Sequence, residues 1–119
     1  DIQKKPILGV CLGMQCLNEY FYGKTVFSPF PMHGKSSLLN HYGHSYFSEI
    51  PKKFPAARYH SLSVEPGRGI EVIADSAEGI PMALTHRDYQ IFGMQYHPES
   101  FMTPHGALMI RNFIKSNNL

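Results

Sequence analysis

Apolar and polar positions follow different patterns in the first part of the chain and in the rest. Residues 6–10 form a short apolar run bounded by proline and glycine. This run is too short for a helix, and it predicts a fully buried strand of the kind found in parallel sheets. Residues 12–22 then favour a helix, with Gly23 in the C′ position at which many helices end. The chain is therefore expected to begin with a strand, a sharp turn and a helix.

The middle of the chain, from residue 24 to residue 63, carries short and mixed signals. Four residues are expected to break any long element there: Pro29, Pro31, Gly34 and Gly43. Residues 54–59 and 62–65 have the composition of two short strands. No long helix or strand is expected in this region.

Three more strands are predicted after the turn at residues 66–69. They cover residues 70–74, 82–85 and 91–95 and are separated by tight turns. Because strands joined by tight turns pair antiparallel, part of the sheet should be antiparallel. The pattern as a whole indicates a mixed α/β fold.

The last helix has clear signals at its start. Thr103 is expected to act as the N-cap and Pro104 to occupy the first helical position. The apolar residues that follow lie on one broad face: Ala107, Leu108, Met109, Ile110, Phe113 and Ile114.

Composition and charge narrow the classes of protein. The 119 residues fit one domain, and a hydrophobic fraction of 43% argues against disorder. A formal charge of +2, with scattered Lys and Arg, is a weak footprint for nucleic acid. No apolar stretch reaches the length of about 18 residues that spans a bilayer, and the first ten residues lack a signal-peptide pattern. Neither nucleic acid nor a membrane is an expected partner.

The two cysteines indicate a reducing compartment. Cys11 and Cys16 are five positions apart in and beside one predicted helix, so their side chains should point about 140° apart, which disfavours a disulfide. A cytoplasmic location is therefore expected. Cys16 is expected to be a core residue. His41 and His44 have a spacing that can bind a metal, but no nearby cysteine or carboxylate completes a set, and no metal site is expected.

The strongest local signal is the pentapeptide from Gly9 to Gly13, centred on Cys11 at the predicted strand-to-helix junction. A nucleophile elbow needs small residues two positions before and two after the nucleophile, because the backbone reverses tightly there. The helix N-terminus would stabilise a thiolate, and the amide N–H of Leu12 would face an oxyanion. The alternative, a small buried cysteine in an ordinary loop, has about equal weight on this pentapeptide alone.

A cysteine nucleophile also needs a base and a group that orients it. His97, Pro98 and Glu99 supply both within three residues. Strand alternation places His97 and Glu99 on the same side, so the carboxylate can hold one imidazole nitrogen while the other faces the thiol. A strand-end histidine beside a solvated glutamate is the alternative, and together with the elbow it is the weaker one.

Four segments in this order resemble class I (triad-type) glutamine amidotransferase domains, over essentially the whole chain. The segments are Gly9-Val10-Cys11-Leu12-Gly13-Met14-Gln15, Met32-His33-Gly34-Lys35, Arg58-Tyr59-His60-Ser61-Leu62 and Gln95-Tyr96-His97-Pro98-Glu99-Ser100. The similarity is greatest to the small subunits of anthranilate synthase and aminodeoxychorismate synthase, which these segments do not separate. The resemblance implies a three-layer, flavodoxin-like fold with a mixed, mainly parallel central sheet and antiparallel C-terminal strands.

The resemblance also implies catalytic roles. Cys11 would form a γ-glutamyl thioester, His97 would act as base and then acid, and Glu99 would orient His97. Leu12 would supply one oxyanion N–H group. Gln15, one helical turn past the nucleophile, would contact the substrate glutamine.

Further substrate contacts are implied at Ser61 and Leu62, whose backbone groups would meet the α-amino and α-carboxylate ends of glutamine. His60 is expected to be structural. The reaction requires neither a cofactor nor a metal. The implied partners are L-glutamine and the large, chorismate-binding subunit of a synthase, which would receive the ammonia.

In one respect the chain departs from the family pattern. Members carry strands, helices and a glycine-rich oxyanion loop before the nucleophile strand, whereas this chain begins at Asp1, just before that strand. Residues 1–119 are therefore expected to be the C-terminal portion of one domain that lacks its N-terminal strands. Losing one oxyanion donor costs about 10²–10³ in rate, so the isolated chain should have weak or absent glutaminase activity. A different class I amidotransferase and a non-catalytic, partner-binding remnant stay open as alternatives.

Overall fold

The computed structural model describes residues 5–119, apart from the side chains of residues 30, 32 and 33. Its elements follow the chain in the order β1 (Ile7–Val10), α1 (Leu12–Tyr20), β2 (Lys24–His41), the 3₁₀ helix η2 (Ser45–Phe47), β3 (Lys53–Glu65), β4 (Ile70–Ser76), β5 (Pro81–His86), β6 (Ile91–Met94) and α2 (Gly106–Ser116). The predicted strand–turn–helix start and the three strands between residues 70 and 95 are confirmed.

One six-stranded mixed sheet joins all the strands in the order β1-β6-β5-β4-β2-β3. β1 pairs parallel to β6, with Val10 opposite Met94, and the other pairs are antiparallel. The mixed α/β sheet is confirmed, and antiparallel pairing makes up more of it than expected. The reason is connectivity: short turns link β4 to β5 and β5 to β6, and only antiparallel strands can be joined that closely.

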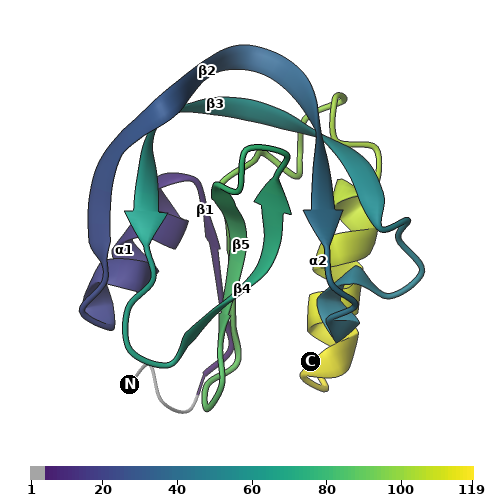
Figure 1. The fold of residues 1–119 in the computed structure, drawn as a ribbon. Helices are drawn as coiled ribbons and strands as arrows, with labels where there is room; N and C mark the ends of the chain where they lie inside the picture. Colours follow the sequence, from purple (N-terminus) through teal and green to yellow (C-terminus); the bar gives the residue numbers. More distant parts are fainter. Residues whose placement is uncertain (1–4) are drawn as a thin grey trace.

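Two helices cover opposite faces of this sheet, which gives the expected three layers (Figure 1). The larger core cluster contains Met109 and Phe113 of α2, together with Ala83 of β5. The smaller cluster contains Met14 of α1 and Leu84 of β5. Because neighbouring residues of a strand point to opposite faces, Ala83 and Leu84 mark the two sides of the sheet.

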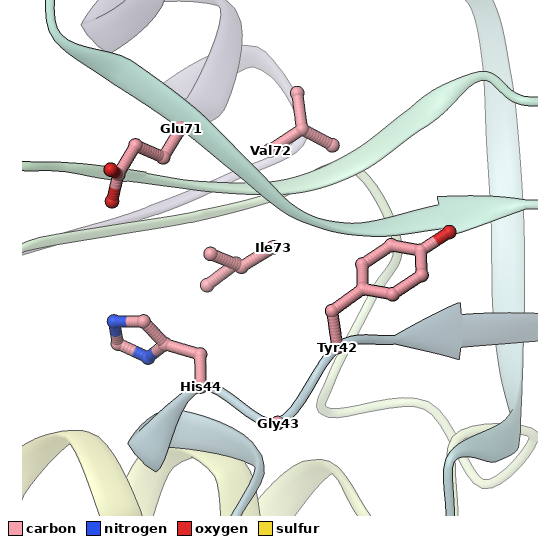
Figure 2. Close-up of a pocket in the computed structure, with 6 residues that line it drawn as sticks. All are labelled: Tyr42, Gly43, His44, Glu71, Val72 and Ile73. Carbon is pink, nitrogen blue, oxygen red and sulfur yellow. The ribbon is translucent and has the colours of Figure 1, made fainter.

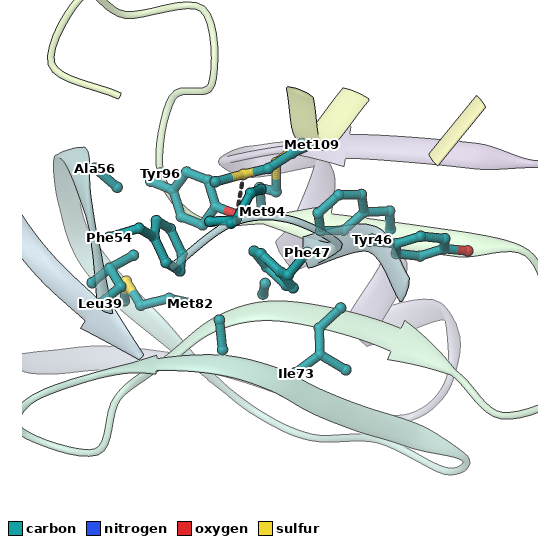
Figure 3. Packing of buried hydrophobic residues seen from close by; sticks show 14 of the residues in the cluster. Leu39, Tyr46, Phe47, Phe54, Ala56, Ile73, Met82, Met94, Tyr96 and Met109 are labelled. Atoms are coloured by element: carbon teal, nitrogen blue, oxygen red, sulfur yellow. Dashed lines mark hydrogen bonds between the residues drawn. The ribbon is translucent and has the colours of Figure 1, made fainter. Parts of the chain in front are cut away.

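The α2 side of the core is rich in aromatic rings and methionines (Figure 3). Tyr96 is fully buried and donates a hydrogen bond from its hydroxyl to the sulfur of Met109, at 3.1 Å. Tyr46 of η2 stacks on Phe92 at 4.7 Å between ring centroids and contacts Phe113 edge-on. These contacts hold in place the segment that follows β6, which includes His97.

The expectation that prolines and glycines break the region from residue 24 onward is wrong. β2 is a single long strand that pairs antiparallel with β3, and the two arch together over the rest of the sheet (Figure 1). The register of this pairing shifts between Phe27 and Met32 and again between His33 and Lys35. The breaking residues therefore produce bulges, which bend a strand without ending it. β3 is likewise one continuous strand where two short ones were expected.

Both predicted helix-end residues have other roles. α1 ends earlier than expected: Phe21 is its C-cap and Tyr22 takes the left-handed conformation, with φ of 69°. Gly23 instead makes room for Asn18, because a Cβ at Gly23 would lie 2.2 Å from the Asn18 side-chain nitrogen.

At the other end of the chain, Thr103 does not cap α2. The N-cap position is His105, and no side-chain hydrogen bond caps it. The Thr103 hydroxyl instead accepts a hydrogen bond from the backbone N–H of Ala57, at 2.9 Å. This long-range contact ties the loop before α2 to β3.

Two further observations concern the cysteines and the membrane. Both cysteines are free, as expected, but Cys16 is exposed, so its assignment to the core is wrong.

Within residues 5–119, neither helix has the length and apolar character needed to cross a bilayer. The cellular compartment stays a prediction.

Candidate active site

Cys11 lies between β1 and α1 in a strained backbone conformation, with φ of 55° and ψ of −105°. Residues other than glycine rarely adopt positive φ, and such conformations cluster at functional sites. A Cβ on Gly9 would lie 2.7 Å from the backbone carbon of Gly13, so glycine is required at position 9. A Cβ on Gly13 would meet nothing within 4 Å, so the expected steric need at that position is absent. The predicted elbow is present, and its tight packing depends on Gly9.

Two buried glutamine side chains are hydrogen-bonded to each other next to Cys11, and one of them, Gln95, contacts its sulfur. Nε2 of Gln95 lies 3.5 Å from Sγ of Cys11, and Nε2 of Gln15 donates to Oε1 of Gln95 at 3.2 Å. The backbone N–H of Cys11 donates to the carbonyl of Met94 at 2.6 Å, which ties the elbow to the end of β6. Gln15 is therefore linked to the sulfur of Cys11 through Gln95, and its contact with substrate stays a prediction.

The backbone N–H of Leu12 is at the start of α1, where N–H groups have no acceptor within the helix. The Leu12 side chain is exposed. A developing oxyanion at Cys11 would therefore meet an N–H donor and the positive end of the helix dipole.

His97 and Glu99 form the predicted pair. Nδ1 of His97 lies 2.9 Å from Oε2 of Glu99, which leaves Nε2 on the opposite side of the ring. The backbone N–H of His97 donates to the carbonyl of Ala57 at 3.1 Å, so the segment is held against β3. The His97 side chain is 28% exposed and that of Glu99 is 67% exposed. At this exposure the pair orients the ring and adds little to stability.

The parallel pairing of β1 and β6 brings these two halves of the site to one edge of the sheet. Cys11 follows β1 directly and His97 follows β6 by three residues, and carboxyl ends of parallel strands meet at the same edge. In the described part of the chain, no hydrogen bond joins Sγ of Cys11 to the His97 ring. Cys11 and His97 thus follow neighbouring parallel strands, and the Cys11 sulfur contacts Gln95.

A cavity of about 410 Å³ lies next to the histidine and is lined by Tyr59, His97, Glu99 and Ser100. Its size falls in the range of small-molecule sites, roughly 300–1,000 Å³. The Tyr59 and His97 rings meet edge to face at 5.4 Å. Ser61, two residues after Tyr59 on β3, is on the same face of that strand and is exposed.

Sequence reasoning gave no role to Tyr59 or Gln95, although both lie within the segments that resemble the family. For Gln95, the available signal was its position two residues before His97, which strand alternation places on the same side. For Tyr59, the signal was the same alternation relative to Ser61. Neither signal identifies the partner atom, because that partner comes from another element.

Leu62 is held by a buried chain of polar groups. Nε of Arg58 donates to Nε2 of His60 at 3.1 Å, and Nδ1 of His60 lies 3.1 Å from the carbonyl of Leu62. Since Arg58 can only donate, His60 is neutral and its Nδ1–H donates to Leu62. Burial lowers the pKa of His60 below its ordinary value, which agrees with this neutral form. His60 is therefore structural, as expected, and it fixes the carbonyl of Leu62.

Arg58 is itself fully buried and pairs with Glu78, at 3.3 Å between Nη1 and Oε1. It also approaches the Ser37 hydroxyl at 3.4 Å. The ion pair balances a charge that would otherwise be costly to bury.

His41 and His44, the two histidines with metal-ligand spacing, form hydrogen bonds to nearby backbone groups. His41 accepts from the backbone N–H of Gly43 through Nδ1 and contacts the carbonyl of Ile50 through Nε2. Nδ1 of His44 accepts from the backbone N–H of Tyr46 and so caps η2. Figure 2 shows His44 on one side of a second cavity, with Glu71 across from it. Among residues 5–119, no group of three or more His, Cys, Asp or Glu side chains could hold a metal ion.

Comparison with known proteins assigns the chain to a family. The family model for glutamine amidotransferase class-I matches residues 2–117. Relatives include an anthranilate synthase component 2 from Archaeoglobus fulgidus, 49% identical and matched over 92% of this chain and 61% of the relative. Another is a chloroplastic anthranilate synthase beta subunit 2 from Oryza sativa, 47% identical and matched over 92% of this chain and 44% of the relative.

Solved structures agree. A Thermoplasma acidophilum protein, described as a candidate component of GMP synthase, superposes with a TM-score of 0.86 at 26% identity, over 92% of this chain and 56% of that one. The chain thus spans about half the length of the relatives that it matches. The chain belongs to the class-I glutamine amidotransferase family.

Proposed function

We propose that this chain is a glutamine amidotransferase component in which Cys11 attacks the side-chain amide of L-glutamine and ammonia is released. One observation carries the proposal: Cys11 is held in a strained turn at the end of β1, and the hydrogen-bonded pair His97–Glu99 follows the neighbouring parallel strand at the same edge. Membership of the family supports glutamine as the substrate.

The proposed reaction has two steps. In the first, His97 takes the thiol proton, the sulfur of Cys11 attacks the amide carbon, and the carbon–nitrogen bond breaks as His97 passes the proton to the departing ammonia. In the second, His97 takes a proton from water, the hydroxide attacks the thioester, and the carbon–sulfur bond breaks as the proton returns to Cys11. Glu99 holds His97 by Nδ1, and the N–H of Leu12 donates to the oxyanion in both steps.

Substrate glutamine is proposed to bind in the cavity beside His97. Gln15 and the backbone groups of Ser61 and Leu62 are its proposed contacts, and the fixed carbonyl of Leu62 supports that role. No cofactor or metal takes part in either step.

The proposed partner is the large, chorismate-binding subunit of a synthase, which would use the ammonia. The relatives are named as components or beta subunits of anthranilate synthase, which favours anthranilate synthesis over 4-amino-4-deoxychorismate synthesis. Their greater length supports a further proposal, that residues 1–119 correspond to the C-terminal portion of one amidotransferase domain.

Covalent labelling tests the proposed chemistry. The purified chain is incubated with an electrophilic diazoketone analogue of glutamine, and intact mass and peptide mapping locate the adduct. We expect one adduct on Cys11, blocked by excess glutamine and absent from the Cys11→Ser variant. Cys16 is an internal control, because it is a free, exposed thiol on the helix that follows Cys11 and should stay unlabelled. Equal labelling of both cysteines, or none on a folded chain, would refute a glutamine site at Cys11.

A second candidate function is a partner-binding module without catalysis. Two observations favour it: the absence of a hydrogen bond between Cys11 and His97 in residues 5–119, and the 67% exposure of the Glu99 side chain. Under this alternative, Cys11→Ser changes neither function nor binding to the large synthase subunit. Under the main proposal, the same variant loses ammonia production.

A further inference from the structure

The two buried amides beside Cys11 have a defined direction. Gln95 is fully buried, and its backbone N–H donates to the carbonyl of Met82 at 2.8 Å, so the residue is fixed at the end of β6. Its side-chain oxygen accepts a hydrogen bond from Nε2 of Gln15 at 3.2 Å. Because the oxygen of Gln95 faces Gln15, the NH₂ group faces the sulfur of Cys11, at 3.5 Å. The hydrogen bonds therefore run in one direction: Gln15 donates to Gln95, and Gln95 donates to the sulfur of Cys11.

Resting on the function proposed above, we propose that Gln95 is a catalytic residue whose side-chain N–H donates a hydrogen bond to the sulfur of Cys11, and that Gln15 is the positioning residue that orients the Gln95 amide.

The chemistry of sulfur decides which state this donor favours. A thiol is a weak acceptor, whereas a thiolate is charged and accepts a hydrogen bond far more strongly. The Gln95 donor therefore favours the thiolate form of Cys11, which is the form that attacks. It also holds the sulfur in a fixed position at the turn between β1 and α1. A buried, neutral amide does this without placing a second charge beside His97. The same donor is available to the sulfur again when negative charge develops on it during departure from the thioester.

Gln15 thereby gains a role beyond its proposed contact with substrate. If its amide were absent, the Gln95 side chain could turn over and present its oxygen to the sulfur, which would repel a thiolate. Gln15 is itself buried on the α1 face that meets β6. The pairing of these two residues across 80 positions of sequence comes from the contact of that helix with β6.

The test measures the rate at which Cys11 is alkylated by iodoacetamide as a function of pH. It is carried out in a Cys16→Ser background, in which Cys11 is the only thiol. Gln95→Met keeps the length of the side chain and removes the donor. We expect the alkylation rate at neutral pH to fall about tenfold, the loss of one hydrogen bond to a charged acceptor, with an unchanged plateau at high pH. A purely structural defect would change the plateau as well.

A second variant covers the case in which Gln95→Met does not fold. Gln15→Met leaves Gln95 in place and removes its orienting partner, so the rate at neutral pH should fall severalfold. In the double variant the fall should equal that of Gln95→Met alone, since Gln15 acts on the sulfur through Gln95. Additive effects would overturn the relay, and a folded Gln95→Met or Gln15→Met variant with the wild-type profile would overturn the proposal.

This test is separate from that of the proposed function. Iodoacetamide needs no glutamine pocket, so the shift in the pH profile is measurable even in a chain that the glutamine analogue fails to label. Labelling by the analogue without any shift in the profile would keep the proposed function and remove the role of Gln95. A shift without labelling would keep the hydrogen bond and remove the glutamine site.

Discussion

The strained backbone at Cys11 predicts that the residue proposed as nucleophile lowers the stability of the protein. Its φ of 55° and ψ of −105° lie outside the regions that residues with a Cβ normally occupy. Such a conformation costs about 1–3 kcal/mol and persists only when the surrounding structure holds it. Here the holding contacts are the 2.6 Å hydrogen bond from the N–H of Cys11 to Met94 and the close approach of Gly9 to Gly13.

The perturbation that isolates this strain is the change from alanine to glycine at position 11. Both variants lack the thiol, so they differ only in the Cβ atom. Glycine should relieve about 1–3 kcal/mol of strain, and it loses about 0.5–1 kcal/mol through the greater freedom of the unfolded chain. We therefore expect Cys11→Gly to be more stable than Cys11→Ala by about 1 kcal/mol, or about 4 °C in melting temperature for a chain of this size.

Urea unfolding and thermal melts of the two variants measure this difference. The matched control is the same pair of substitutions at Cys16. This residue lies in the middle of α1, and its side chain is exposed to solvent. There the backbone is helical, and glycine should be less stable than alanine by about 1 kcal/mol. The two sites are thus predicted to respond with opposite signs. If glycine were destabilising at both sites to the same extent, the strain assigned to Cys11 would be refuted.

Two further predictions concern the elbow and the buried polar chain. Gly9→Ala should lower the free energy of unfolding by about 1–3 kcal/mol, because the new Cβ would meet the backbone of Gly13, whereas Gly13→Ala should be neutral or stabilising by up to about 1 kcal/mol; equal effects in urea unfolding would contradict the assigned packing. His60 is neutral in the fold with a lowered pKa, so its stabilising contribution is complete above its unfolded value of 6.5 and is lost as the pH falls toward its folded pKa. His60→Gln, which keeps an acceptor for Arg58, should reduce this pH dependence by up to about 1.4 kcal/mol per pH unit; an unchanged dependence between pH 5 and 8 would argue that His60 is charged in the fold. Burial lowers the pKa of His44 as well, so part of the dependence should remain in that variant.

Local patterns in the sequence were sufficient for the parts of the fold that depend on near neighbours. The run from Pro6 to Val10 and the strand before His97 were predicted because a short apolar segment between turn residues has few other solutions. The elbow was predicted for the same reason, since Gly9 and the strained Cys11 belong to one turn. The pair His97–Glu99 was also local, two residues apart on one side of the chain.

The errors share a physical cause, which is that a distant element supplied the deciding contact. Pro29 and Pro31 do not end β2, because pairing with β3 continues on both sides of the bulges. Thr103 provides no cap to α2, because its hydroxyl accepts from Ala57 of β3. The assignment of Cys16 to the core is a separate error, because α1 leaves that side chain exposed.

The sequence by itself determined the residues on which the proposed chemistry rests: a cysteine in a turn that needs a glycine at position 9, and a histidine followed closely by a carboxylate. Such features depend on residue type and short spacing, which the chain displays directly. The tertiary structure alone decided what meets the sulfur. Gln95 lies just after β6, and the parallel pairing of β1 with β6 brings it to Cys11. There it meets the side chain of Gln15, which lies on α1 one helical turn past Cys11. Which strand pairs with β1 depends on contacts between segments far apart in sequence, because the pairing must bury both faces of the sheet. No local pattern specifies that partner.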